Sequence, residues 1–251
     1  MITLRSPYAR LQHASPLAKD SHFTFDEAFA RALRFREINP REAFTVVDSE
    51  GAFFRASLKS LSESGGEALV YEAMHGSTES PAHVTLVCGV LGRQRMLTVA
   101  QKATELGCER IVPVLSDHSV QRVDLEREKP WAWQGQAIKA SRQCRRASVP
   151  EVAKVISLSD VLSAAYWTTA NRIFLLDDRL DAPADPFAGL PTEGDYVLAI
   201  GPEGGWSDDE RARLKGAGAA VLRLGTRVLR AETAVFSGLS VLQHRLGDLR
   251  A

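Results

Sequence analysis

The sequence predicts an α/β protein in which a small antiparallel β-domain precedes a larger domain built on a mostly parallel sheet. Three observations support this prediction. The composition, with 45% hydrophobic and 25% charged residues in a chain of 251, is typical of a soluble globular protein with a substantial core. Short strand-like runs separated by turns occupy residues 23–74, and strand-like and helix-like segments alternate from residue 84 onward.

The first domain is expected over residues 1–75 as a small antiparallel barrel or sandwich. Its strand-like runs, AFTVVDS, AFFRASL and EALVYEAM, are separated by the turn-forming sequences DSEG and ESGG. Residues 25–38 are predicted to hold a helix, because their apolar residues recur at helical spacing. The polar stretch HGSTESPAH at 75–83 is the linker candidate, and the second domain is expected over residues 76–251.

The second domain shows the alternation of a parallel sheet. The run VTLVCGV at 84–90 is continuously apolar, as in a strand buried on both faces, and a helix with one apolar face is predicted over 93–107. Alternation of this kind implies helices on both faces of the sheet. Further strands are expected at 110–115, 151–156, 172–178, 195–201 and 219–225, and further helices at about 124–147, 159–168, 207–216 and 231–246.

Charge and cysteine content narrow the classes of protein. The chain has 31 basic and 31 acidic residues, and this zero net charge argues against a protein that binds polyanions over its whole surface. It does not exclude a local basic patch. Cys88, Cys108 and Cys144 are widely spaced, so reduced thiols in a cytoplasmic protein and no metal are expected. The sequence shows no apolar leader and no run of about 18 apolar residues. Neither a secretory signal nor a membrane span is therefore expected.

Three loops follow predicted strands at the edge where open parallel sheets bind ligands. They are IGPEGGWSDDE at 200–210, RLGTRVLRAET at 223–233 and LLDDRLD at 175–181. The glycines of the first loop allow backbone amides to approach a ligand without a clash with Cβ atoms. Ser207 is predicted to cap the following helix, with Glu210 as its capping-box partner.

Glycine spacing excludes two common nucleotide sites, but it does not by itself establish another. The first loop is neither GxGxxG nor GxxxxGK[ST], so a Rossmann-type oxidoreductase and a P-loop are excluded. A glycine-rich turn can also be only a turn. Arg230 and Glu232 can form an ordinary surface pair, and Asp177 and Asp178 can be turn formers instead of catalytic acids.

A basic segment, KASRQCRR at 139–146, also has two interpretations. It can be the solvated face of a helix. Lys139, Arg142 and Arg146 nevertheless recur at helical spacing, as in a stripe that contacts phosphates. His83 and His118 have no partner visible in the sequence and are interpreted as structural.

Two loop motifs in combination carry a family resemblance. The sequences LAIGPEGGWSDDE at 198–210 and LRLGTRVLRAETA at 222–234 resemble the RsmE family, the bacterial uracil N3-methyltransferases of 16S ribosomal RNA within the SPOUT superfamily. The segment VAQKATELGCERIVPVLSDHSV at 99–120 is similar to the same family, and the likeness covers residues 84–247. Residues 33–58 resemble the family's N-terminal PUA-like, RNA-binding barrel more weakly.

The resemblance implies a C-terminal trefoil knot whose loops bind S-adenosyl-L-methionine, and a homodimer formed through the knot domain. The first and second glycine loops would form two walls of the cofactor pocket, and the end of the strand before Asp177 would form the third. The cofactor-binding residues expected from the resemblance are Leu176, Leu198, Ile200, Gly201, Pro202, Glu203, Gly204, Gly205, Leu224, Gly225, Val228, Leu229, Arg230 and Thr233.

The implied reaction transfers a methyl group to N3 of uridine 1498 of 16S ribosomal RNA in the small ribosomal subunit. Arg230 would stabilise the negative charge that develops on the uracil oxygens, and Glu232 would orient Arg230 or act as the base, with Glu203 as the other candidate base. Two alternatives remain open. One is a SPOUT enzyme acting on another ribosomal or transfer RNA base, and the other is a non-catalytic RNA-binding protein. The residues expected to contact RNA are Arg93, Arg95, Lys139, Arg142 and Arg146.

Overall fold

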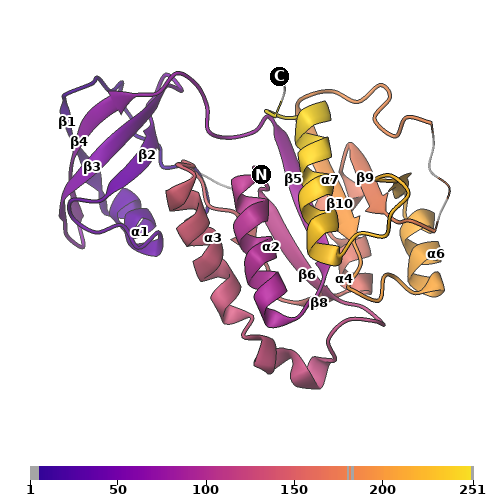
Figure 1. Cartoon of the computed structure of the whole chain (residues 1–251). Coiled ribbons are helices and arrows are strands. Elements are labelled where there is room, and N and C mark those ends of the chain that lie inside the picture. Colours follow the sequence, from indigo (N-terminus) through magenta and orange to yellow (C-terminus); the bar gives the residue numbers. More distant parts are fainter. Residues whose placement is uncertain (1–5, 180, 182–183, 250–251) are drawn as a thin grey trace. The chain divides into compact units, whose positions relative to one another are not determined.

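The structure is a computed structural model that describes residues 6–179, 181 and 184–249, and the chain divides into two compact units (Figure 1). The first unit contains the chain up to Glu79 together with Ile138–Pro150, and the second contains Ser80–Ala137 and the chain from Glu151. A single boundary near residue 75 was expected. The observed division differs because residues 138–150, expected in the second domain, belong to the first unit.

The first unit is built on a four-stranded antiparallel sheet of order β1-β4-β3-β2. The expected runs match three of its strands, whereas β1 was not anticipated, and its last two residues fall within the stretch 25–38 that was expected to hold a helix. The helix α1 (Glu27–Phe35) begins directly after β1, where the Asp26 carboxylate accepts a hydrogen bond of 2.9 Å from the amide of Phe29. The strands are β1 (His22–Asp26), β2 (Ala43–Val47), β3 (Phe53–Leu61) and β4 (Gly65–Ala73).

Hydrogen bonds to main-chain carbonyl groups attach residues 138–150 to the rest of the first unit. The amide of Leu11 donates to the carbonyl of Ala147 at 3.1 Å, and the Thr45 hydroxyl donates to the carbonyl of Arg145 at 2.7 Å. Arg36, which is 4% exposed, donates to the carbonyl oxygens of Ala9 at 2.5 Å and Ala147 at 3.4 Å. The partners in residues 138–150 lie at least 100 positions from Leu11, Arg36 and Thr45, so local patterns give no sign of the attachment.

The second unit is built on a seven-stranded sheet in which every strand pair is parallel. The strand order is β11-β9-β10-β5-β6-β7, with β8 also paired to β6. The α/β class, with an antiparallel first part and a parallel second part, is therefore confirmed. The strands are β5 (Ala82–Gly89), β6 (Arg110–Leu115), β7 (Glu151–Val152), β8 (Ile156–Ser157), β9 (Arg172–Leu176), β10 (Gly194–Ile200) and β11 (Ala220–Leu222).

Helices cover both faces of this sheet, as the alternation predicted. Two of the expected helices are broken. The segment from residue 124 is a 3-10 helix followed by α3, and the segment from 159 is split because Ala164 adopts an extended backbone with ψ 147°. The helices are α2 (Arg93–Glu105), η1 (Arg122–Glu128), α3 (Trp131–Gln143), α4 (Leu158–Ser163), α5 (Ala165–Thr168), α6 (Asp208–Gly216) and α7 (Ala231–Arg245). Among the described residues, no helix has the length and apolar character needed to cross a membrane.

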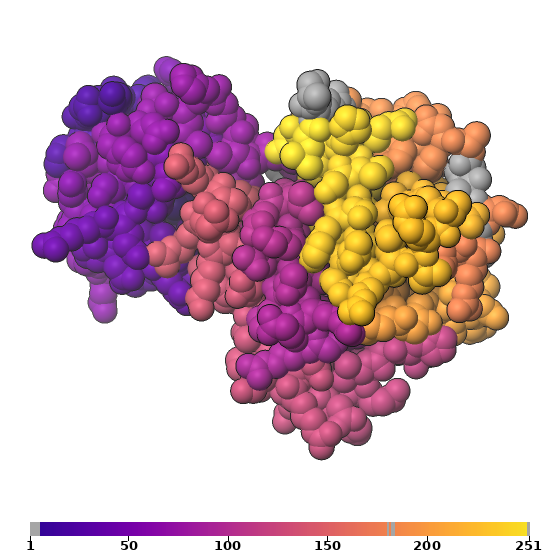
Figure 2. All heavy atoms as spheres, viewed as in Figure 1, coloured from indigo at the N-terminus to yellow at the C-terminus, as the bar shows by residue number. Residues whose placement is uncertain are grey.

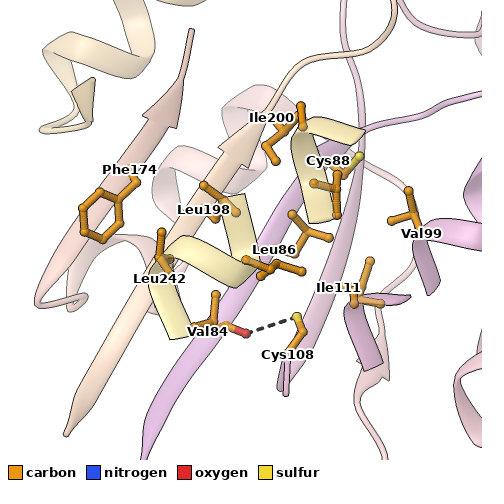
Figure 3. Close-up of a cluster of buried hydrophobic side chains, with 14 of the residues drawn as sticks. Val84, Leu86, Cys88, Val99, Cys108, Ile111, Phe174, Leu198, Ile200 and Leu242 are labelled. Atoms are coloured by element: carbon orange, nitrogen blue, oxygen red, sulfur yellow. Dashed lines mark hydrogen bonds between the residues drawn. The ribbon is translucent and has the colours of Figure 1, made fainter. Parts of the chain in front are cut away.

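The two faces of the sheet carry separate cores. On one face α2 and α7 pack side by side, and they form neighbouring magenta and yellow surfaces in Figure 2. Figure 3 shows the core beneath them, which contains Leu86 of β5, Leu198 of β10 and Leu242 of α7. On the other face, side chains of α4, α5 and α6 pack against Val87 and other residues of the sheet. Alternate residues of β5 therefore enter different cores, as in a strand covered on both sides.

Candidate functional site

A cavity of about 660 Å³ lies in the second unit, where the loops after β9, β10 and β11 meet the start of α7. These strands are parallel, so their carboxyl ends share one edge of the sheet, which is where ligands bind in open α/β sheets. The three loops singled out from the sequence therefore line one pocket. The described residues contain no group of three side chains able to hold a metal ion.

The turn after β10 folds tightly on itself. The amide of Gly205 donates to the carbonyl of Pro202 at 2.8 Å, and Gly205 has a φ of +71°, a conformation that favours glycine. A Cβ atom on Gly201 would lie 2.9 Å from the amide nitrogen of Trp206, so no larger residue fits without movement of the turn. The glycines are thus required by the backbone path, and they leave main-chain groups facing the pocket.

Neighbouring loops fix this turn from outside. A Cβ atom on Gly89, the last residue of β5, would lie 2.5 Å from the ring of Pro202. The Nδ1 atom of His118 lies 3.1 Å from the carbonyl oxygens of both Gly204 and Gly205, so it must carry the proton and donate. His118 had no partner visible in the sequence, because its partners lie more than 80 residues away.

The helix after the turn begins as the sequence predicted. The Ser207 hydroxyl accepts from the amide of Glu210 at 3.3 Å, and the Glu210 carboxylate accepts from the amide of Ser207 at 2.9 Å, which completes a capping box. Glu210 also accepts from the amide of Asp117 at 3.0 Å, and Ser207 donates to the Asp117 carboxylate at 2.6 Å. The cap therefore also ties the loop after β6 to the start of α6.

Asp177 has a structural role at the bottom of the pocket. Its carboxylate lies 2.7 Å from Nε of Arg211, and the two side chains are 3% and 7% exposed. A Cβ atom on Gly205 would lie 3.3 Å from the same guanidinium, so this ion pair links the end of β9 to α6 beneath the glycine turn. Asp178 is exposed and lines the cavity. Asp177 therefore fits the structural interpretation, and its partner, Arg211, could not be identified from the sequence.

The loop from 223 to 230 forms the opposite wall. Gly225 has a φ of +80°, and Val228 is 83% exposed although it is apolar. Arg230 is the N-cap residue of α7, with an extended backbone, and its side chain is exposed. Within the part of the chain that the structure describes, the Arg230 guanidinium has no ion pair or hydrogen bond, so it is available to a ligand.

Two carboxylates and one guanidinium meet at the pocket. Arg95 of α2 forms an ion pair with Glu203 of the glycine turn, and its Nε lies 3.9 Å from Oε2 of Glu232. The Oε2 atom of Glu232 is buried and has no hydrogen-bond partner among the described residues. A buried carboxylate oxygen without a donor is costly unless a ligand supplies one. Glu232 is therefore an acceptor that the pocket leaves open.

Most of the predicted cofactor residues line this cavity, with two exceptions. Leu198 is completely buried against α7, where a Cβ atom on Gly238 would lie 2.9 Å from it. Thr233 is exposed on α7 and is not part of the lining. Sequence reasoning did not select several residues that do line the cavity, since they are spread over separate loops. The additional lining residues are Arg179, Trp206, Arg211, Arg223, Arg227, Ala231 and Ala234. The cavity is also lined by Glu232, expected as a catalytic residue, by Arg95, expected as an RNA contact, and by Asp177 and Asp178, which the sequence left open as turn formers or acids.

The structure does not present the predicted RNA-contacting residues as one stripe. Arg93 is exposed at the start of α2, whereas Lys139, Arg142 and Arg146 belong to the first unit. Arg142 pairs with Glu42 at 2.7 Å. Arg146 is only 6% exposed and pairs with Glu79 at 2.8 Å. Arg146 thus neutralises a buried carboxylate, which the helical spacing of basic residues could not reveal.

Comparison with known proteins gives a consistent match. The family model for the RNA methyltransferase domain matches residues 78–243. The chain is 28% identical over 219 residues to Ribosomal RNA small subunit methyltransferase E of Aquifex aeolicus, which covers 87% of this chain and 92% of that protein. It is 26% identical over 224 residues to the protein of the same name from Bacillus subtilis, covering 85% and 86% of the two chains.

Solved structures show the same similarity in three dimensions. Ribosomal RNA small subunit methyltransferase E from Neisseria gonorrhoeae, bound to S-adenosyl methionine, has a TM-score of 0.67 and 27% identity, covering 96% of this chain and 99% of that one. A putative methyltransferase from Legionella pneumophila, in complex with the same cofactor, also has a TM-score of 0.67, with 26% identity and coverage of 96% and 100%. The similarity therefore extends over both units.

Proposed function

This chain belongs to the RNA methyltransferase family whose domain model it matches, and on that premise we propose that it methylates N3 of a uridine in 16S ribosomal RNA, at position 1498 by resemblance. The observation that carries the proposal is the single pocket in which the glycine turn, Arg230 and two carboxylates meet. The names of the relatives support the small-subunit RNA as the substrate.

The pocket fits S-adenosyl-L-methionine. Its walls combine apolar side chains, including Leu176, Ile200 and Leu229, with the main chain of two glycine-bearing loops. The volume of about 660 Å³ lies within the range of pockets that enclose small ligands. When bound, the cofactor supplies a methyl group already activated by its sulfonium. The carboxylates of Asp178 and Glu232, which line the cavity, suit that positive charge.

We assign the proton-accepting role to Glu232. N3 of uracil must lose its proton as it attacks, and a base must lie within reach of that proton. The Glu232 Oε2 atom is buried without a donor, so it can accept one. Glu203 is less suited because its carboxylate is engaged by Arg95. Arg95 was expected to contact RNA. Its contacts with Glu203 and Glu232 instead suit a residue that positions these two carboxylates.

We assign charge stabilisation to Arg230. Loss of the N3 proton spreads negative charge onto O2 and O4 of the uracil, and a preorganised cation beside these oxygens lowers the energy of the transition state. Arg230 has an exposed guanidinium at the rim of the pocket and is fixed at its backbone by the start of α7. Alignment of N3 with the methyl group in this confined site adds to the acceleration.

Three further features of the proposal come from the family. The loops of the second unit would form a trefoil knot, two chains would associate through that unit, and the first unit would act as a PUA-like RNA-binding domain. Ribosomal RNA as the substrate would also imply a cytoplasmic protein. Sedimentation analysis of the purified chain tests the association of two chains. A species of twice the monomer mass is expected.

Mass-spectrometric mapping of ribosomal RNA from cells with and without this protein tests the proposed reaction. Loss of one N3-methyluridine from the small-subunit RNA is expected in the deletion strain, and it should return when the chain is restored. Loss of a different modified base would assign the protein to another RNA methylation. An unchanged RNA together with no cofactor uptake in calorimetry would indicate a non-catalytic RNA-binding protein.

A further inference from the structure

We propose that four arginines at the rim of the pocket form a docking surface for the phosphate backbone of single-stranded RNA beside the target nucleotide. The inference deepens the proposed function and rests on it. It moves the expected RNA contacts from the basic stretch at 139–146 to the loops of the pocket itself. The four residues, called the rim arginines below, are Arg179, Arg223, Arg227 and Arg230.

The rim arginines come from two loops that meet at the cavity. Arg179 follows β9, and the other three belong to the loop between β11 and α7. All four side chains are exposed, and among the described residues none of them has an ion pair or a side-chain hydrogen bond. Their guanidinium groups are therefore open to an incoming polyanion without the loss of a contact that the structure describes.

The balance of charge in the pocket also favours a polyanion at the rim. Six arginines and four carboxylates line the cavity, although the whole chain has equal numbers of basic and acidic residues. Two of those arginines are already paired, Arg211 with Asp177 and Arg95 with Glu203. Arg95 also lies 3.9 Å from Glu232, so among the described lining residues the rim arginines face one carboxylate without an ion pair, that of Asp178. The positive excess is thus concentrated on exposed side chains.

The rim arginines differ from the arginines of the basic stretch at 139–146 in whether they are already in ion pairs. Arg142 and Arg146 are paired with Glu42 and Glu79, so contact with a phosphate would require an existing ion pair to break. The rim arginines need no such exchange. Guanidinium groups also match phosphate oxygens in a two-pronged geometry. A cation near a phosphate releases condensed counterions, which makes RNA binding depend on salt.

A second anion could occupy one of these arginines, namely the carboxylate of the cofactor's own methionine group. The experiment therefore measures the two ligands separately. A variant with Arg179→Ala, Arg223→Ala and Arg227→Ala removes three rim charges and keeps Arg230 for catalysis. A matched control, Arg122→Ala, Lys154→Ala and Lys215→Ala, removes three exposed charges of the same unit outside the pocket.

Binding of each protein to unmethylated small ribosomal subunits is measured across a series of salt concentrations, and cofactor binding is measured by calorimetry. Wild type must first methylate these subunits, so that failure of the proposed function is detected separately. The rim variant is expected to bind more weakly and to lose about two units from the salt slope, since each single-stranded phosphate contact contributes about 0.7. The control is expected to keep the wild-type slope.

Two results would overturn the inference. One is a rim variant whose salt slope equals that of wild type. The other is an equal loss of slope in the control, because net charge and not the rim would then explain the effect. Weaker cofactor binding with an unchanged slope belongs to the first case, and it would assign the arginines to the methionine carboxylate.

Discussion

Arg211 and Asp177 form a nearly buried ion pair beneath the pocket, with Nε and Oδ2 2.7 Å apart. The pair joins the end of β9 to α6, and it lies against the glycine turn through the close approach of Gly205. A partly satisfied buried pair is far less stable than a complete one, because the remaining charge is left in a poorly solvated environment. The pair therefore joins two of the elements that line the pocket.

Replacement of Asp177 by Asn is expected to lower the free energy of unfolding by about 3 kcal/mol, since Arg211 is left buried without its main carboxylate. Urea denaturation of the purified chain measures the change. Cofactor affinity should fall as well, because the turn above the pair loses its support. The double variant Asp177→Leu, Arg211→Met should recover much of the stability, and a double variant less stable than Asp177→Asn would contradict this role.

Replacement of Arg230 by Ala is expected to reduce kcat by about 10²- to 10³-fold, the loss typical of a single preorganised stabiliser of developing charge. Cofactor affinity should remain close to that of wild type, because Arg230 lies at the rim and the apolar walls are unchanged. Single-turnover methylation and calorimetry provide the two measurements. Normal turnover by the Ala variant on small ribosomal subunits would exclude the assignment.

Replacement of Glu232 by Gln is expected to lower the rate of methyl transfer by about 10²- to 10⁴-fold, the usual contribution of a positioned base. The remaining rate should increase with pH, because hydroxide must then remove the N3 proton. Glu203→Gln is the matched control, since that carboxylate is engaged by Arg95. A larger loss in the Glu203 variant than in the Glu232 variant would reverse the two roles.

Replacement of Gly201 by Ala is expected to weaken cofactor binding by at least about tenfold, or about 1.4 kcal/mol. The added methyl group would lie 2.9 Å from the amide nitrogen of Trp206, so the turn must open. Gly216→Ala is the control, because a Cβ atom there meets nothing within 4 Å. The control should bind the cofactor as wild type does, and calorimetry compares the two proteins directly.

The pair of Glu79 and Arg146 predicts how the stability of the first unit depends on pH. Burial raises the pKa of Glu79, but the charge of Arg146 and hydrogen bonds from Ser148 and Arg146 outweigh it and hold the pKa below its usual value. A lowered pKa stabilises the folded state above the unfolded pKa, and this stability is lost as the pH falls through the folded pKa.

Glu79→Gln should therefore lower the melting temperature at neutral pH, and the difference from wild type should shrink below about pH 4. Thermal unfolding followed across a pH series provides the measurement. If the difference in melting temperature stays constant from neutral to acidic pH, the charge of the Glu79 carboxylate does not contribute to stability, and the side chain acts through its packing alone.

Local features of the site could be predicted from the sequence. The capping box of Ser207 and Glu210 and the glycine turn before it involve residues only a few positions apart, so spacing alone defines them. The position of the loops at one edge of a parallel sheet followed from the alternation of strands and helices. These features were sufficient to locate most of the pocket.

Long-range pairs could not be predicted in the same way. Arg95 and Glu203 are 108 residues apart, and Asp177 and Arg211 are 34 apart, so no periodicity links them. Arg142 and Arg146 are a further example, because their helical spacing gave no sign of the tertiary ion pairs that they form with Glu42 and Glu79. Residues 138–150 likewise joined the first unit through partners distant in the sequence.

The first turn of α6 has a consequence for ligand selection. A helix start is normally an anchoring point for phosphates, but here Asp208, Asp209 and Glu210 neutralise its positive pole. Adenosine triphosphate shares its nucleoside with the methyl donor yet would bring a highly charged tail towards these acids. The start of α6 is thus removed as a phosphate anchor, and an anionic ligand of this pocket is left to bind the rim arginines on the opposite loop.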